Sequence, residues 1–191
     1  MCCRYEVNPG SEKAEAIVTL LEKLYPDTAY KTGEIFPGDT APGVIDRGGR
    51  ILPVPATFGF PGRRGSELIL NARSETAAEK PMFADSLRER RIVLPADGFF
   101  EWSHTGEKTK YFFTVEALRT IYLCGVYKIV DGRVRFVILT CPANESMLET
   151  HDRMPVIVSD GLVRPYLTDR EAAMEIIATS APLLKRREAA I

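Results

Sequence analysis

The chain has 191 residues, a net charge of −1 and a hydrophobic content of 45%, which is typical of one globular domain over residues 1–191. The sequence has neither an apolar run of 18 residues nor a basic segment followed by an apolar one at its start, which argues against a membrane span and a signal peptide and favours a cytoplasmic protein. The near-neutral charge supplies no overall field for nucleic acid, so DNA binding would need a local cluster of Arg and Lys.

The first predicted element is a helix that begins near Ser11 and is closed by Pro26. Its expected apolar face consists of Ile17, Leu20, Leu21 and Leu24. From about residue 44 to 158 the pattern changes to short apolar runs, which predict strands at 110–116, 121–128 and 134–140. Asp131-Gly132 lies between the last two and predicts a hairpin turn.

Two further helices are predicted, one around residues 79–90 and one from Thr168, where Thr168 and Glu171 have the spacing of a capping box. The basic cluster at 185–187 is expected to be a solvated tail. These elements predict an α+β fold: a single domain with a mostly antiparallel, barrel-like β core and a few flanking helices.

The four cysteines match neither a disulfide framework nor a CxxC pair, which argues against structural zinc. Cys2 has the most distinctive chemistry, because removal of Met1 is expected before a small residue and would give Cys2 a free α-amine beside its thiol. Such an aminothiol condenses with an aldehyde to an imine, and its sulfur then closes a thiazolidine ring. From position alone, Cys2 is more often a small residue that starts a strand.

Residues 71–76 (NARSET) follow an apolar run and predict a strand that leads into a structured turn. The amide of Asn71 can orient a nucleophile, and the guanidinium of Arg73 can hold a phosphate. Taken alone, Asn71 is more often a turn or capping residue and Arg73 a surface ion-pair partner.

Residues 94–103 (LPADGFFEWS) predict a turn followed by a strand that carries Glu101 and Trp102. Alternation along the strand puts Phe100 and Trp102 on one face and Phe99 and Glu101 on the other. Burying a carboxylate there is costly, so Glu101 is either a site residue or a paired structural acid. Trp102 alone is more often a core residue than a platform for a base.

Residues 151–158 (HDRMPVIV) place His151 and Arg153 where a loop enters an apolar strand, a position at which functional groups gather. Taken alone, His151 is as easily a hydrogen-bonded structural histidine. The other histidine, His104, lies in a predicted turn and is expected to be exposed.

Together the segments resemble the SOS-response-associated peptidase (SRAP) family of abasic-site-crosslinking proteins. The resemblance spans nearly the whole chain and rests on the ordered combination of MCCR, NARSET, GFFEW and HDRMP. It implies a monomer that acts on single-stranded DNA containing abasic sites, associates with the nucleoid when bound, and needs neither a metal nor an organic cofactor.

Carried over by residue, the resemblance makes Cys2 the nucleophile and Asn71 the residue that orients it. Glu101 becomes the acid/base beside the amine, and His151 the proton donor near the sugar. The positions expected to grip phosphates are Arg4, Arg73 and Arg153. The positions expected to pack against bases are Pro37, Phe58 and Trp102.

The sequence departs from the family pattern at two places. Cys3 stands where the family usually has Gly, and residues 58–60 read Phe-Gly-Phe where the family usually has Trp-Gly-Leu. We expect Cys3 to crowd the site or to pair with Cys2 on oxidation. Phe58 is expected to stack on a base with less area than Trp.

The sequence is therefore compatible with three functions. The favoured one is a covalent adduct between Cys2 and the aldehyde of an abasic site, which shields the lesion. The second is a thiol peptidase that uses Cys2, Glu101 and His151 and cuts itself or other proteins. The third is a DNA-binding barrel without covalent chemistry, which would tolerate Cys2→Ala.

Overall fold

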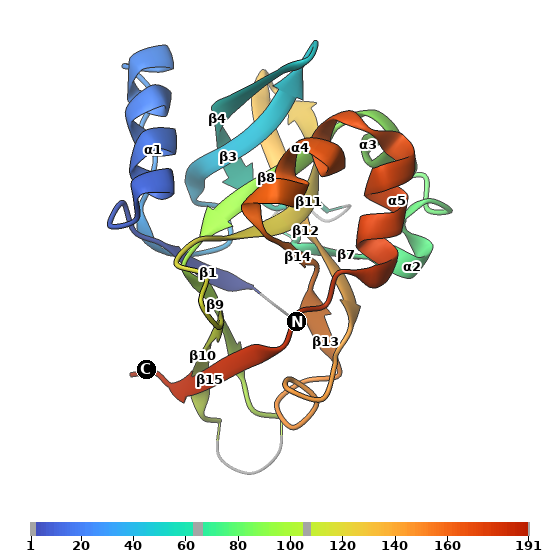
Figure 1. Cartoon of the computed structure of the whole chain (residues 1–191). Coiled ribbons are helices and arrows are strands. Elements are labelled where there is room, and N and C mark those ends of the chain that lie inside the picture. The colour runs from blue at the N-terminus through green and yellow to red at the C-terminus, as the bar shows by residue number, and fades with distance from the viewer. Residues whose placement is uncertain (1–2, 63–66, 105–107, 191) are drawn as a thin grey trace.

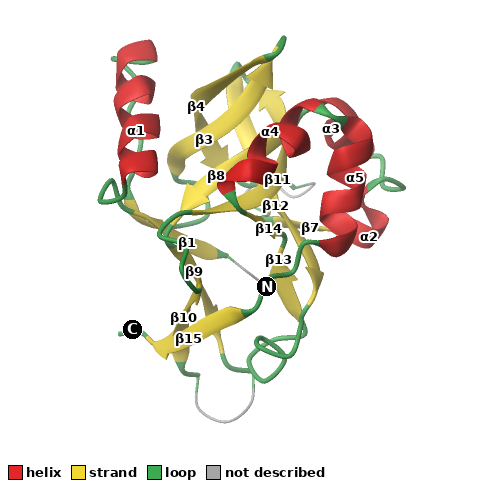
Figure 2. Ribbon diagram, in the orientation of Figure 1, coloured by secondary structure: helices red, strands yellow, loops and turns green. Residues whose placement is uncertain are grey.

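The computed structural model describes residues 3–62, 67–104 and 108–190. Five helices in this part flank two main sheets, with α1 on one side of the strands and the other four on the opposite side (Figures 1 and 2). The helices are α1 (Glu12–Leu24), α2 (Ser74–Ala77), α3 (Ala84–Glu89), α4 (Asp160–Thr168) and α5 (Arg170–Thr179). Within the described residues, no helix is both long and apolar enough to span a bilayer.

The larger sheet closes on itself through β12, which pairs with β4 on one side and β11 on the other. The ring β12–β4–β3–β8–β11 is a five-stranded barrel, and every pairing in it except β12–β4 is antiparallel. The barrel-like, mostly antiparallel core predicted from the sequence is therefore confirmed. The strands of this sheet are β3 (Thr40–Arg47), β4 (Arg50–Phe58), β7 (Asn71–Arg73), β8 (Arg91–Ala96), β11 (Ile121–Val130), β12 (Arg133–Pro142), β13 (Arg153–Pro155) and β14 (Ile157–Val158).

The second sheet has the order β15-β10-β9-β1-β2 and is antiparallel throughout. Its strands are β1 (Arg4–Val7), β2 (Gly33–Ile35), β9 (Gly98–Trp102), β10 (Lys110–Val115) and β15 (Leu184–Glu188). A short pair, β5 (Phe60–Pro61) and β6 (Leu68–Ile69), lies apart. The chain returns to the second sheet at Gly98, where a Cβ atom would lie 2.3 Å from the carbonyl oxygen of Phe113. Only glycine allows the backbone of β9 to approach the paired strand β10 so closely at this position.

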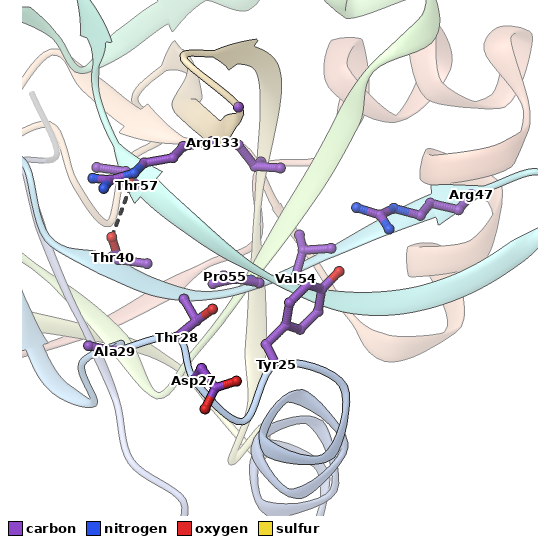
Figure 3. Close-up of a pocket in the computed structure, with 12 residues that line it drawn as sticks. Tyr25, Asp27, Thr28, Ala29, Thr40, Arg47, Val54, Pro55, Thr57 and Arg133 are labelled. Carbon is purple, nitrogen blue, oxygen red and sulfur yellow. Dashed lines mark hydrogen bonds between the residues drawn. The ribbon is translucent and has the colours of Figure 1, made fainter.

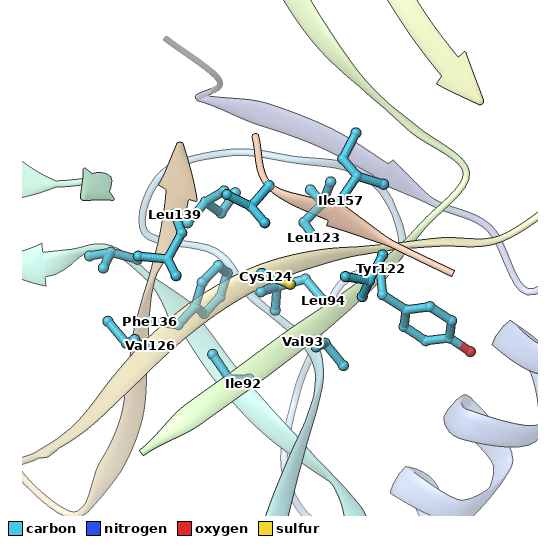
Figure 4. Close-up of a cluster of buried hydrophobic side chains, with 14 of the residues drawn as sticks. Ile92, Val93, Leu94, Tyr122, Leu123, Cys124, Val126, Phe136, Leu139 and Ile157 are labelled. Carbon is cyan, nitrogen blue, oxygen red and sulfur yellow. The ribbon is translucent and has the colours of Figure 1, made fainter. Parts of the chain in front are cut away.

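The barrel interior is filled by apolar side chains that alternate inward along its strands (Figure 4). Phe58 belongs to this core: it is fully buried and stacks on Phe136 with ring centroids 5.0 Å apart. Burying a side chain of this size stabilises the fold by about 1.5–3 kcal/mol. The expectation that Phe58 stacks on a base is therefore wrong for this structure, because the ring has no exposed face.

The predicted first helix is confirmed, but its buried face is rotated from the expected one. Ser11 caps α1 by accepting a hydrogen bond from the backbone N–H of Ala14 (3.2 Å). The buried positions are Ala14, Val18 and Leu21, whereas Leu20 and Leu24 are exposed. The apolar stripe of the helix is wider than the face that packs on the core. The periodicity alone therefore does not show which side of the stripe is buried.

The hairpin predicted at Asp131-Gly132 is confirmed, since both residues have positive φ (50° and 72°), as a type I′ turn requires. The helix predicted around 79–90 is confirmed only as the shorter α3. Helix α5 is capped by Asp169, which accepts from the N–H of Ala172 (3.0 Å). The predicted Thr168–Glu171 capping box is therefore wrong.

Strand β15 and helix α4 are among the elements that were not predicted. Residues 185–187, expected to be a solvated tail, lie in β15 and pair with β10 at the edge of the second sheet. Helix α4 precedes α5 and contains Pro165 in its interior. Proline there lowers the helical signal of the segment, whereas packing of Val163, Tyr166 and Leu167 in the core holds the helix.

Candidate active site

The four sequence segments meet where the second sheet approaches β12. Strand β1 lies beside β9, with Arg4 opposite Phe100. Strands β7 and β13 flank β12 from its two sides, since Thr140 is paired with Arg73 on one and Pro155 on the other. The residues before β13 and the end of β9 are in turn brought together at Glu101 and His151. The fold therefore gathers segments that are far apart in sequence.

Glu101 is at the centre of this site and is only 3% exposed. It lies in β9 with its neighbours on alternate faces, as predicted: Phe99 stacks on Phe113 (5.2 Å between centroids) and Phe100 packs on Phe112 (4.8 Å). One carboxylate oxygen accepts from the backbone N–H of Trp102 (3.2 Å). A carboxylate buried to this degree is placed for proton transfer to a group brought beside it.

One ring nitrogen of His151 is contacted by two groups that favour opposite protonation states of that nitrogen. Its Nδ1 atom is 2.9 Å from the backbone nitrogen of Arg153 and 2.7 Å from Oδ1 of Asp152. The backbone N–H favours an unprotonated Nδ1, whereas the carboxylate favours a protonated one. Burial lowers the pKa of His151 more than the nearby charge of Glu101 raises it, and His104 lowers it further, so a neutral ring that can change tautomer prevails at pH 7.

His104 is exposed, as predicted, but no sequence pattern indicated its position next to His151. The two ring centroids are 4.4 Å apart and the ring planes meet at 71°. Both histidines line a hollow of about 330 Å³ together with residues 148–150 and 152. No spacing rule connects positions 104 and 151, because the contact arises from the packing of β9 against the loop before β13.

The expected nucleophile, Cys2, lies outside the described residues. The next residue, Cys3, is partly buried beside the site. Burial, followed by the negative charge of Glu101, raises the pKa of the Cys3 thiol. Cys3 is therefore a protonated thiol at neutral pH and a slow nucleophile. Its oxidative pairing with Cys2 stays a prediction.

Asn71 and Arg73 lie in β7, whose register places them opposite Ile138 and Thr140 of β12. Asn71 is partly buried and Arg73 is exposed. Among the described residues, Arg73 makes no ion pair. Its guanidinium is thus available to an external anion, which agrees with the predicted phosphate contact.

Arg153 differs from the expectation of a phosphate-gripping residue, because its side chain is only 10% exposed and both of its terminal nitrogens are bound by the protein. Both terminal nitrogens donate to the Glu75 carboxylate, with Nη2–Oε2 at 2.8 Å, and Nη2 also donates to the Thr140 carbonyl (2.5 Å). Hydrogen bonding from Arg153 lowers the pKa of Glu75 to about 2. The pair ties α2 to β12 and β13, so its first role is structural. Glu75 itself was not singled out from the NARSET segment.

Arg4 and Trp102 form a cationic and aromatic cluster on the outer face of the second sheet. The guanidinium carbon of Arg4 lies 4.3 Å from the ring centroid of Phe36 and 4.9 Å from that of Trp102. Arg4 is also 3.3 Å from Glu34. Pro37, next to Phe36, is exposed. A phosphate would have to compete with Glu34 for Arg4.

A larger cleft of about 520 Å³ lies between the end of α1 and strands β3, β4 and β12 (Figure 3). Tyr25, Arg47 and Arg133 are among the residues that line it. None of the described residues predicted to act in catalysis or DNA binding lines this cleft. Size alone therefore does not identify the chemical site.

The fold and the site together define an α+β barrel protein whose attached sheet carries a buried carboxylate beside two imidazoles. Solved structures share this fold. A protein of Bacteroides thetaiotaomicron has a TM-score of 0.80 at 20% identity, covering 99% of this chain and 92% of its own. A protein of Bordetella bronchiseptica has a TM-score of 0.78 at 19% identity and covers 100% of both chains.

The chain belongs to the SOS response associated peptidase (SRAP) family, whose family model matches residues 1–189. The abasic site processing protein YedK of Escherichia coli is 27% identical over 186 residues, 92% of this chain and 83% of YedK. The abasic site processing protein YobE of Bacillus subtilis is 34% identical over 109 residues. That match spans 53% of this chain and about half (50%) of YobE.

Proposed function

We propose that this protein processes abasic sites in single-stranded DNA by forming a covalent adduct through Cys2 after removal of Met1. The observation that carries the proposal is that Glu101 and His151 lie together in one site, and that residue 3 lies beside it. The SRAP family model matches the chain over residues 1–189. The curated relatives are named abasic site processing proteins, which supports the same class of substrate.

The reaction follows from the two nucleophiles of an N-terminal cysteine. The neutral α-amine of Cys2 attacks the C1′ aldehyde of the ring-opened sugar, and loss of water gives an imine. The thiol then adds across the C=N bond, its proton passes to nitrogen, and a thiazolidine ring closes. This product lacks the imine that promotes strand cleavage, so the lesion is shielded. All atoms in these steps come from the protein and the sugar.

Glu101 and His151 have complementary parts in this proposal. Glu101 accepts the proton that the attacking amine releases, because it is a buried carboxylate on the face of β9 toward the loop that holds His151. His151 supplies a proton to the ring oxygen of the sugar as the ring opens, and its other nitrogen takes up the proton that the C1′ hydroxyl loses, so the imidazole stays neutral. The two groups competing for its Nδ1 atom allow the ring proton to lie on either nitrogen.

The DNA strand would be held mainly by Arg73, with Arg4 and Trp102 as further contacts on the outer face of the sheet. Arg73 is exposed, so it can bind a phosphate without losing a protein partner among the described residues. Flanking bases can pack on Pro37 and Trp102, since aromatic and proline surfaces accept any base without sequence preference. An abasic strand suits the site, because no base has to be displaced from it.

A thiol peptidase is the alternative, because the family description itself contains the word peptidase and because a thiol, an imidazole and a carboxylate are the usual groups for that chemistry. The same residues, Cys2, His151 and Glu101, would act. A limited cut that exposes Cys2 is compatible with the adduct chemistry, whereas general proteolysis is not required by it.

The test separates the amine from the thiol. Cys2→Ala with Met1 removed keeps the amine, so abasic single-stranded DNA should give an adduct that borohydride traps and little stable adduct on a denaturing gel without borohydride. A protein with one residue added before Cys2 should give neither, since the amine becomes an amide. Crosslinking by the extended protein at the parent rate would refute the mechanism, and cleavage of a peptide substrate lost in Cys2→Ala would support the peptidase.

A further inference from the structure

We propose that Glu101, His104 and His151 form a binding site for a divalent transition-metal ion, with Zn²⁺ as the best match, and that metal bound there switches the site off. The ligand atoms of these three side chains all lie within 4.8 Å of one another. His104 belongs to none of the four sequence segments assigned to the reaction. The inhibitory part of this inference rests on the proposed function, but metal binding itself does not.

The donor set is the first argument. Two imidazoles and one carboxylate are the ligands of many sites in which Zn²⁺ keeps a fourth position for water. Zinc binds these groups at about 2.0–2.2 Å, which sets ligand atoms about 3.3–3.5 Å apart in a tetrahedron. The ligand atoms, now up to 4.8 Å apart, therefore have to move closer by up to about 1.5 Å. His104 can make this movement, because it is exposed.

The surroundings of His151 are the second argument. Metal-bound histidines usually donate their other ring N–H to a carboxylate or carbonyl, which fixes the ring and strengthens the donor nitrogen. Oδ1 of Asp152 lies 2.7 Å from Nδ1 of His151. In the tautomer that donates from Nδ1 to Asp152, which gives up the hydrogen bond from the backbone N–H of Arg153, Nε2 is the nitrogen that would bind a metal.

The shape of the site is the third argument. Glu101 is buried and its ligand atom lies within 4.8 Å of those of both histidines, whereas His104 and His151 line an open hollow of about 330 Å³. An ion can enter from solvent through this hollow and keep a bound water. The carboxylate of Glu101 would gain a cation next to it in a poorly solvated position, where such a contact is strong.

Metal at this position would block the proposed chemistry in a defined way. Glu101 would have its oxygen lone pair on the metal and accept no proton from the Cys2 amine, and His151 would have one ring nitrogen occupied. The site would then hold DNA without forming the adduct. Adduct formation would thus depend on metal availability, although the reaction itself requires no metal.

The first experiment measures binding without DNA. The full chain is freed of metal with a chelator and titrated with Zn²⁺ in competition with a chromophoric chelator. We expect one ion per chain and at least about tenfold weaker binding by His104→Gln. Leu148→Ala, which changes an exposed residue of the same hollow, should bind as the parent does. Circular dichroism confirms that both variants are folded.

Cysteine thiols also bind zinc, so Co²⁺ is used to identify the ligands. Nitrogen and oxygen ligands give weak visible bands, whereas a thiolate adds an intense sulfur-to-cobalt band in the near ultraviolet. We expect the visible bands in the parent and their loss in His104→Gln. Equal Zn²⁺ affinity of parent and His104→Gln, or a Co²⁺ spectrum dominated by sulfur and unchanged in that variant, would overturn the proposed site.

The second experiment measures adduct formation with abasic single-stranded DNA. We expect Zn²⁺ to slow the parent at least about tenfold, a chelator to restore it, and His104→Gln to keep its metal-free rate in the presence of Zn²⁺. Equal slowing of parent and variant would refute the switch. If neither protein forms an adduct without metal, the proposed function fails while the metal site is still judged by the binding experiment.

Discussion

The ion pair between Glu75 and Arg153 makes the stability of the fold depend on pH in a predictable way. Arg153 holds the pKa of Glu75 at about 2, against about 4.3 in an unfolded chain. At face value this difference corresponds to about 3 kcal/mol at pH 7. The Glu75 side chain is 43% exposed, so solvent screening reduces the expected contribution to about 1–2 kcal/mol.

Because folding lowers the pKa of Glu75, its ion pair with Arg153 stabilises the fold only while the carboxylate is ionised. The contribution is complete above the unfolded value and disappears as the pH falls from about 4.3 toward 2. Urea unfolding of the parent and of Glu75→Gln should therefore differ by about 1–2 kcal/mol at pH 7 and by about half as much at pH 3. An equal difference at both pH values would refute this reasoning, because it would mean that the carboxylate charge contributes nothing.

Four other changes test the remaining assignments. Arg73→Ala should weaken binding to single-stranded DNA and reduce the salt dependence of that binding by about one unit of slope, without changing the unfolding midpoint. Equal salt slopes in the parent and Arg73→Ala would show that Arg73 holds no phosphate. Arg153→Ala, in contrast, should lower the free energy of unfolding by about 3 kcal/mol. Glu101→Gln should slow adduct formation far more than it lowers DNA affinity, and a matched loss in both would move Glu101 to the binding surface. Phe58→Ala should cost about 3–5 kcal/mol in urea unfolding, and a stable variant with weakened DNA binding would restore the stacking role.

Features set by neighbouring residues were predictable from the sequence. The helix from Ser11 and the turn at Asp131-Gly132 depend on a cap and on positive φ, and both signals lie within a few residues. The alternation that sends Glu101 and Trp102 to opposite faces of β9 is equally local. The family resemblance then joined segments that no local rule connects.

The remaining features depend on partners distant in the chain. Arg153 has the side chain of a phosphate-binding residue. Its structural role arises only because Glu75, 78 residues away in the chain, lies beside it. Phe58 is removed from the surface by Phe136. His104 becomes part of the site through its contact with His151. In each case the decisive neighbour is supplied by tertiary packing, which periodicity and spacing do not contain.

The placement of β15 also affects how copies of this protein meet one another. A strand at the edge of a sheet offers unpaired backbone groups to any other strand. Here one edge of the second sheet is β15, whose positions 185–188 are all charged and exposed, and the other is β2, only three residues long. Edge-to-edge addition of a second copy would bring the same basic side chains together. The sheet that carries Glu101 thus discourages aggregation at both of its edges.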